Sequence, residues 1–80
     1  MNPRAKEIKP LQDYTLEILF SNNERKKFDV KPYLNRGIFK SLEDSKLFQT
    51  AHADHGTVVW NNGLDLCPDT LYMDSNKLAD

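Results

Sequence analysis

The sequence predicts a small α+β domain: two antiparallel hairpins plus an extra strand, with short helices packed on one side. Three observations indicate this fold class. Apolar residues alternate with other residues from Tyr14 to Ser21, which is the period of a strand with one apolar face. Asparagine-rich turns at 21–24 and 61–63 each connect two strand-like segments. Pro68 then begins a short helix, because proline suits the first helical position.

The length and composition limit what this chain can be. With 80 residues, 39% of them hydrophobic and 29% charged, we expect one globular domain over 1–80. Its core should span about 3–74, and residues 75–80 should form a polar tail that frays. No apolar run approaches the ~20 residues of a membrane helix, and no apolar block follows the first charges. The single cysteine, Cys67, excludes an internal disulfide, so we expect a reducing compartment, the cytoplasm.

The charge is unevenly distributed along the chain. Residues 1–40 carry nine Lys and Arg against five Asp and Glu, whereas residues 41–80 carry two against seven. Such polarity can steer a charged partner. Its more ordinary interpretation is that each half has its own solvated face.

The first hairpin follows an N-terminal strand. Lys6–Pro10 is the predicted extra strand, and Pro10 places it at an edge because proline cannot donate to a strand ladder. The segment 11–13 connects it to the alternating strand. After the turn at 21–24, Arg25–Val30 returns as the next strand.

Side-chain alternation determines the register of this hairpin. A two-residue loop would place Phe28 opposite Glu17, on the polar face. A three-residue loop instead places Phe28 on the face of Leu16 and Ile18, so we expect the odd loop. Asn23 should then adopt a left-handed backbone, which asparagine tolerates better than most residues.

Short helices should lie over one face of the sheet. Pro32 and Gly37 bracket at most one helical turn. Two more short helices follow, and Asp44 can cap the second. Their inward residues at helical spacing are Ile38, Phe39, Leu42, Leu47 and Phe48.

The second half contains the other predicted hairpin. Residues 51–54 can begin a strand that ends at His55-Gly56. Thr57–Trp60 and Leu64–Leu66 should pair through a three-residue loop, with Gly63 supplying the positive φ. This register pairs Trp60 with Leu64, and the helix beginning at Pro68 follows.

Several segments together resemble a known family. Their order and spacing resemble the bacterial family of domains of unknown function numbered twenty-four forty-two, over about Pro3 to Asp74. Asn23 and Asn61 depart from its pattern, since glycine and proline are usual there. The segments are Phe20–Asn22, Phe28–Leu34, Arg36–Phe39, Gly56–Trp60, Asn62–Gly63 and Pro68–Tyr72.

The resemblance implies a fold and a context but no reaction. It implies a small α+β domain of antiparallel strands and short helices. Some relatives carry a helix-turn-helix domain after this one. Many are small stand-alone proteins encoded beside another small protein, an arrangement similar to toxin–antitoxin pairs. No catalytic residues follow from the resemblance.

One cluster has the residue types of a metal site: His52, Asp54 and His55. In a strand His52 and Asp54 share a face, and His55 points away unless Gly56 breaks the strand. Structural metal sites usually need four ligands and catalytic sites three, and this spacing matches no ligand signature. The alternative is a polar strand end with surface histidines. The residues that could complete a site are Asp65, Cys67 and Asp69.

Cys67 precedes the predicted helix, where the helix dipole can lower a thiol pKa. A nucleophilic cysteine also needs a base, and His52 or His55 are the candidates. Against this, such a cysteine can act simply as a small apolar residue. Asp69 has an ordinary use in the first helical turn, and Asp65 should be solvated.

Basic residues and one tryptophan are the candidate partner-binding residues. Arg25, Lys26 and Lys27 could form a basic sheet edge with Arg4, Lys6 and Lys9. The sequence pI of about 6.1 argues against nucleic acid as the ligand. Lysines on an edge strand also block aggregation. Trp60 could anchor an interface, or pack across the hairpin against Leu64.

The sequence therefore favours a binding protein without a catalytic set or cofactor. We expect protein–protein binding, in which the chain neutralises or regulates another small protein in the manner of an antitoxin. An exposed sheet edge or the Trp60 hairpin would dock the partner. The alternative is a homodimeric regulatory or scaffold domain, related to the proteins with a helix-turn-helix extension. A metal-dependent or thiol enzyme, built on His52, Asp54, His55 and Cys67, is the third alternative.

Overall fold

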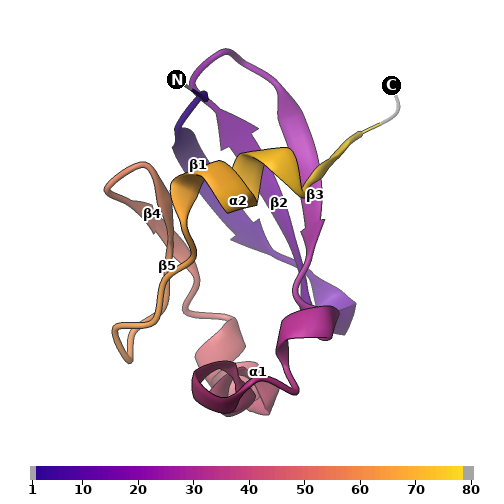
Figure 1. Cartoon of the computed structure of the whole chain (residues 1–80), viewed down its shortest axis with the longest axis vertical. Coiled ribbons are helices and arrows are strands. Elements are labelled where there is room, and N and C mark those ends of the chain that lie inside the picture. Colours follow the sequence, from indigo (N-terminus) through magenta and orange to yellow (C-terminus); the bar gives the residue numbers. More distant parts are fainter. Residues whose placement is uncertain (1, 79–80) are drawn as a thin grey trace.

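A four-stranded antiparallel sheet with the order β1-β2-β3-β6 forms the largest part of the fold (Figure 1). The computed structural model describes residues 2–78. A two-stranded sheet, β4-β5, lies beside it. The strands are β1 Ala5–Pro10, β2 Thr15–Phe20, β3 Arg25–Asp29, β4 His52–Asp54, β5 Thr57–Val59 and β6 Asn76–Lys77. The helices are α1 Ser45–Phe48 and α2 Pro68–Met73, with short 3₁₀ helices at Gln12–Tyr14, Lys31–Tyr33 and Gly37–Glu43.

The register of the first hairpin is the one that the apolar pattern predicts. Leu16 lies opposite Phe28, which the three-residue loop requires. The loop is closed by hydrogen bonds from the Phe20 amide to the Glu24 carbonyl and from the Asn23 amide to the Phe20 carbonyl, both 2.9 Å long. Asn23 has a φ of 69°, so its predicted left-handed backbone is also confirmed.

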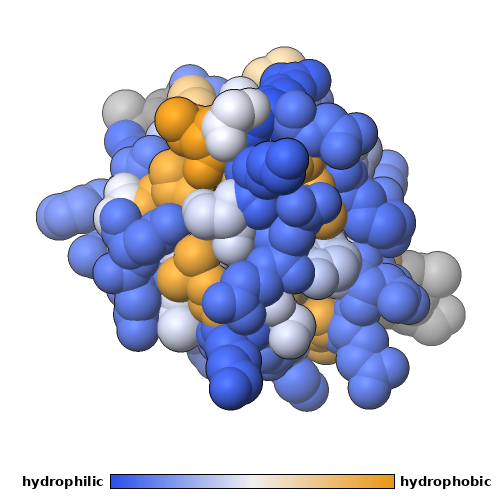
Figure 2. All heavy atoms as spheres, turned by 90° about the horizontal axis from the view of Figure 1, so that it is seen from below, coloured by the Kyte–Doolittle hydropathy of each residue, from blue (hydrophilic) through white to orange (hydrophobic). Residues whose placement is uncertain are grey.

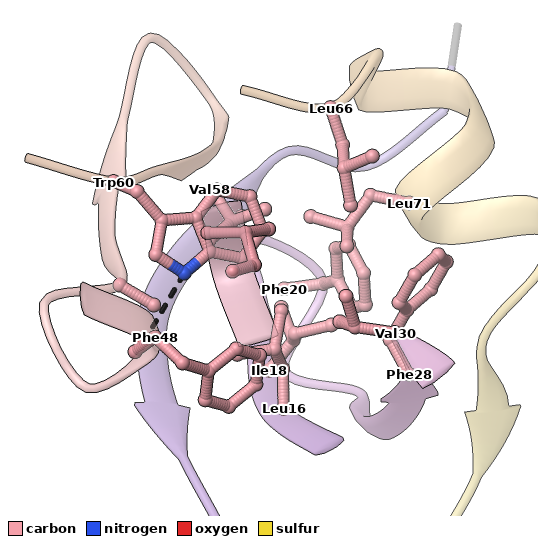
Figure 3. Packing of buried hydrophobic residues seen from close by; sticks show 13 residues of the cluster. Leu16, Ile18, Phe20, Phe28, Val30, Phe48, Val58, Trp60, Leu66 and Leu71 are labelled. Carbon is pink, nitrogen blue, oxygen red and sulfur yellow. Dashed lines mark hydrogen bonds between the residues drawn. The ribbon is translucent and has the colours of Figure 1, made fainter. Parts of the chain in front are cut away.

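One face of the four-stranded sheet is covered and the other is open. The even-numbered residues of β2 face the core, and α2 crosses over this face (Figure 1). The Gly37–Glu43 helix and α1 lie beyond one end of the strands (Figure 1), and their residues Leu42 and Phe48 join the same buried cluster as Leu16. This confirms the predicted α+β architecture with helices on one side. Figure 3 shows the fully buried side chains of this core, among them Leu16, Ile18, Phe20, Phe28, Val30, Phe48, Val58, Trp60 and Leu71.

Local signals set the helix boundaries. The Asp44 carboxylate accepts a 3.0 Å hydrogen bond from the Lys46 amide and caps α1, as predicted. Pro68 occupies the first turn of α2 and Leu71 is fully buried. Tyr14 was expected to be the first residue of the alternating strand. Its φ of 57° excludes it from that strand, which begins at Thr15, and Tyr14 instead belongs to the Gln12–Tyr14 helix.

The second half pairs differently from the prediction. The segment His55-Gly56 is the turn of a β4–β5 hairpin, with φ angles of 52° and 78°. Two consecutive positive φ angles suit the right-handed twist of a two-residue hairpin. The predicted pairing of 57–60 with 64–66 keeps its register but is reduced to one bridge, Val59 to Asp65. Its loop closes with a 2.9 Å hydrogen bond from the Trp60 amide to the Leu64 carbonyl.

The end of the described chain extends the sheet. Asn76 and Lys77 pair with Lys27 and Lys26 as β6, so the predicted fraying after Asp74 is wrong for these residues. The Leu78 amide adds a 3.1 Å bond to the Arg25 carbonyl. The last part of the predicted tail, 79–80, lies outside the described residues. None of the helices within 2–78 has the length and apolar content to cross a bilayer.

Candidate functional site

The candidate metal ligands lie at the β4–β5 hairpin and remain spread along it. His52 and Asp54 share the exposed face of β4, and Nδ1 of His52 is 2.8 Å from the Thr50 carbonyl oxygen. His55 stands in the turn, with its Nε2 3.9 Å from Oδ2 of Asp54. Over residues 2–78, no three His, Cys, Asp or Glu side chains converge as metal ligands would. The arrangement is that of exposed side chains on a strand end.

The Cys67 thiol is exposed at the start of α2. The backbone amide of Thr70, followed by that of Asp69, holds the pKa of the Cys67 thiol below its ordinary value. These are hydrogen bonds within one helical turn, and no histidine is among the groups acting on the thiol. Asp69 accepts a 3.2 Å hydrogen bond from the Asn2 side chain. The groups that lower the thiol pKa therefore come from the first turn of α2.

The basic residues do not form one sheet edge. β3, which carries Arg25, Lys26 and Lys27, lies between β2 and β6, and β2 separates it from β1 with Lys6 and Lys9. Arg25 and Lys27 are on the open face, where Arg25 forms a 3.4 Å ion pair with Glu17. Lys26 turns to the covered face instead. The predicted basic edge is therefore divided between two strands and two faces.

Lys26 belongs to a polar cluster that the sequence pattern does not indicate. Its Nζ lies 3.7 Å from the ring centroid of Tyr72 and donates a 3.1 Å hydrogen bond to the Tyr72 carbonyl. The Tyr72 hydroxyl donates to Glu24. This bond, followed by the Asn22 amide, holds the pKa of Glu24 below its ordinary value, and the Glu24 carboxylate raises the pKa of Tyr72. The cluster connects α2 to the β2–β3 hairpin. Its members are almost fifty residues apart in the sequence, so no local pattern predicts that residues 22–26 contact Tyr72.

Trp60 is a core residue. Its side chain is only 1% exposed, and its indole Nε1 donates a 3.2 Å hydrogen bond to the Phe48 carbonyl (Figure 3). Its ring centroid lies 6.2 Å from that of Phe48. Trp60 therefore offers almost no surface to a partner, and the core-packing alternative describes its position.

Ile38 is exposed where an inward position was expected. Its side chain is 70% exposed, whereas Leu42 is fully buried and Phe39 is half-buried. The cause is the type of helix: Gly37–Glu43 is a 3₁₀ helix with three residues per turn, so Phe39 and Leu42 share a face that excludes Ile38. The prediction assumed α-helical spacing, which would have placed all three together.

Ile38 stands on a partly apolar surface at one end of the molecule. We call the exposed and half-buried apolar residues of segment 33–47 the apolar end. Figure 2 looks from below at the end of the molecule where this segment lies in Figure 1, and shows groups of hydrophobic atoms separated by polar ones. Its exposed or half-buried apolar residues are Tyr33, Leu34, Ile38, Phe39 and Leu47.

The fold and these surfaces define a class of protein: a small α+β domain with one covered sheet face, in which residues 2–78 contain no group of three His, Cys, Asp or Glu side chains that could hold a metal ion. The comparison with known families identifies the particular one. The chain belongs to the family described as Protein of unknown function (DUF2442), whose model matches residues 5–77. The resemblance seen in the sequence is thereby confirmed. No curated protein and no solved structure matches the chain.

Proposed function

We propose that this domain is a protein-binding module that neutralises or regulates another small protein, in the manner of an antitoxin, in a bacterial cytoplasm. The observation that carries the proposal is the exposure of Ile38 within the apolar end. Apolar residues that gather at a surface, rather than scatter singly, often mark a protein-binding site. The single cysteine supports the reducing compartment.

The apolar end is held in place by contacts that leave Ile38 free. The Tyr33 and Phe39 rings meet edge to face with centroids 5.8 Å apart, and the Arg36 guanidinium lies 4.8 Å from the Tyr33 centroid. The Asn62 side chain donates a 3.2 Å hydrogen bond to the Ser41 hydroxyl, and this bond connects the Gly37–Glu43 helix to the turn after Trp60. A surface fixed before binding loses little conformational entropy when a partner docks.

The other open surface offers less to a partner. On the open face of the sheet, Glu17 lies between Lys9 and Lys27 in register, and opposite charges therefore neutralise one another within the face. Pro10 removes one donor from the edge strand β1, which weakens docking by strand addition. The apolar end combines an apolar centre with the cations Arg36 and Lys40 on the same segment. A partner with an apolar patch bordered by carboxylates fits it best.

Co-expression with the product of the neighbouring gene tests the proposal. We expect the two proteins to co-purify, and Ile38→Asp to reduce the retained partner at least tenfold, as loss of a central interface residue does. Met73→Asp is the matched control, because Met73 is also 70% exposed but lies on α2. Normal retention by Ile38→Asp, or an equal loss with Met73→Asp, would remove the apolar end from the interface. No co-purification and no effect on the neighbour's activity or on growth would refute the antitoxin function.

The same surface supports a second candidate, a homodimeric regulatory or scaffold domain. Twofold dimers use one self-complementary patch on both subunits, and an apolar surface that includes the exposed Ile38 suits that geometry. Molar mass measured by light scattering over a range of concentrations distinguishes the two. A dimer that Ile38→Asp converts to a monomer would support this candidate, and a monomer at every concentration would exclude it.

A further inference from the structure

Three segments that are distant in sequence line a shallow hollow that is open to solvent, with a volume of about 420 Å³. They are the start of β1, the β2–β3 turn and the β4–β5 turn, all near the N-terminal end in Figure 1. We call it the cationic hollow. Its lining residues are Arg4, Ala5, Lys6, Ser21, His55 and Gly56.

The side chains lining the cationic hollow can donate hydrogen bonds but bring no carboxylate. The guanidinium of Arg4 and the ammonium of Lys6 form no ion pair with any residue in the described range 2–78. The Ser21 hydroxyl oxygen accepts a 3.1 Å hydrogen bond from the Arg4 amide, which leaves its O–H to donate. One carboxylate contacts a lining residue, since Asp54 Oδ2 lies 3.9 Å from His55 Nε2.

Arg4 is held in position at the centre of the hollow. The Ser21 amide donates a 2.8 Å bond to the Arg4 carbonyl, and the next residue, Ala5, donates a 2.9 Å bond to the Gly56 carbonyl. The Arg4 side chain lies so closely over Gly56 that a Cβ there would be 2.6 Å from Arg4 Cδ. Backbone and aliphatic stem are thus fixed by two turns, and only the guanidinium is left to meet a ligand.

We propose that the cationic hollow binds an oxyanion group, the phosphate or carboxylate of a small molecule. Arg4 supplies the planar donor fork that matches such groups, because its guanidinium can donate two parallel hydrogen bonds to them. Lys6 in β1 adds a second charge two residues further along the chain, and the Ser21 hydroxyl adds a neutral donor. This site is separate from the apolar end, so it does not depend on the proposed partner.

A titration of the full chain followed by amide NMR tests the site. Inorganic phosphate and acetate are added in separate arms at constant ionic strength, with sodium chloride as the balancing salt. We expect saturable shifts at the amides of Arg4, Ala5, Lys6, Ser21 and Gly56 in at least one arm. The tighter arm assigns the ligand class: phosphate for phosphorylated molecules, acetate for carboxylates.

Three variants define the outcome. Arg4→Gln keeps the aliphatic stem over Gly56 and should weaken binding at least about tenfold, because the charge-assisted hydrogen bonds of the guanidinium are lost. Lys6→Gln should weaken it less, and Arg36→Gln, an exposed arginine in the apolar end, should leave it within about twofold. Unchanged amide shifts elsewhere establish that each variant is folded. Shifts that rise linearly without saturation in both arms, or equal weakening by Arg4→Gln and Arg36→Gln, would overturn the proposal.

Discussion

Replacing Trp60 by phenylalanine tests whether this residue stabilises the fold from inside. The change removes the indole donor of the 3.2 Å bond to the Phe48 carbonyl, which keeps a 3.2 Å bond from the Ala51 amide. Loss of one such hydrogen bond costs about 1 kcal/mol. A residual cavity of roughly 40 Å³, at about 24 cal/mol per Å³, adds about 1 kcal/mol more. We therefore expect Trp60→Phe to lower the free energy of unfolding by about 2 kcal/mol, since the two costs add.

Equilibrium unfolding in urea measures this loss. Far-ultraviolet circular dichroism is the signal to follow, because the variant lacks the only tryptophan of the chain and cannot be monitored by tryptophan fluorescence. With a slope near ~1 kcal/mol per M for so small a domain, the midpoint should fall by roughly 2 M. Ile38→Ala is the control, and its exposed side chain should change stability by less than about 0.5 kcal/mol. A Trp60→Phe midpoint within the error of wild type would show that Trp60 is not packed and bonded as described.

Three further predictions concern backbone geometry and the polar cluster. Gly56→Ala should destabilise by at least about 1 kcal/mol in the same urea assay, because a Cβ at a φ of 78° is strained and would meet Arg4; a neutral result would contradict the close approach. Asn23→Gly should stabilise by roughly 0.4–1 kcal/mol by relieving a φ of 69°, and a lower midpoint would count against it. Tyr72→Phe should flatten the acid side of the stability profile. The Tyr72 hydroxyl lowers the pKa of Glu24 from 4.5, so the wild type gains stability above that value and loses it as pH falls through the folded pKa. The control Tyr33→Phe should keep the wild-type dependence of stability on acidic pH. Parallel profiles for the wild type, Tyr72→Phe and Tyr33→Phe would show that the Tyr72–Glu24 hydrogen bond does not cause this dependence.

Patterns within one hairpin were predictable because they follow local rules. The β2–β3 register follows from the period of two together with the three-residue loop, and Asn23 is left-handed for the same reason. The Asp44 cap and the Pro68 helix start are likewise encoded within four residues of sequence.

Features that depend on distant residues or on helix type could not be predicted in this way. β6 has only two residues, too few to show alternation, and its position is set by the unpaired edge of β3. The sequence did not predict that His55-Gly56 forms the turn of a hairpin. This turn requires a positive φ at both residues, which histidine adopts less readily than glycine. Ile38 was placed inward because the sequence does not distinguish three residues per turn from 3.6. The sequence indicated Arg4 and Lys6 as part of a basic sheet edge and His55 as a candidate metal ligand, but their position beside Ser21 in one hollow depends on contacts between distant segments.

The pairing of β3 with β6 has a consequence for the order of folding. Lys26 and Lys77 are far apart in the sequence, so their pairing closes a long loop, residues 27–76. Local hairpins form within microseconds, whereas such closure costs more entropy and comes later. The β2–β3 hairpin should therefore protect its amides from hydrogen exchange first, and Leu78 and its β3 partner last. In that interval β3 is an unpaired edge, and the charges of Lys26 and Lys27 keep it from joining the edge of a second nascent chain.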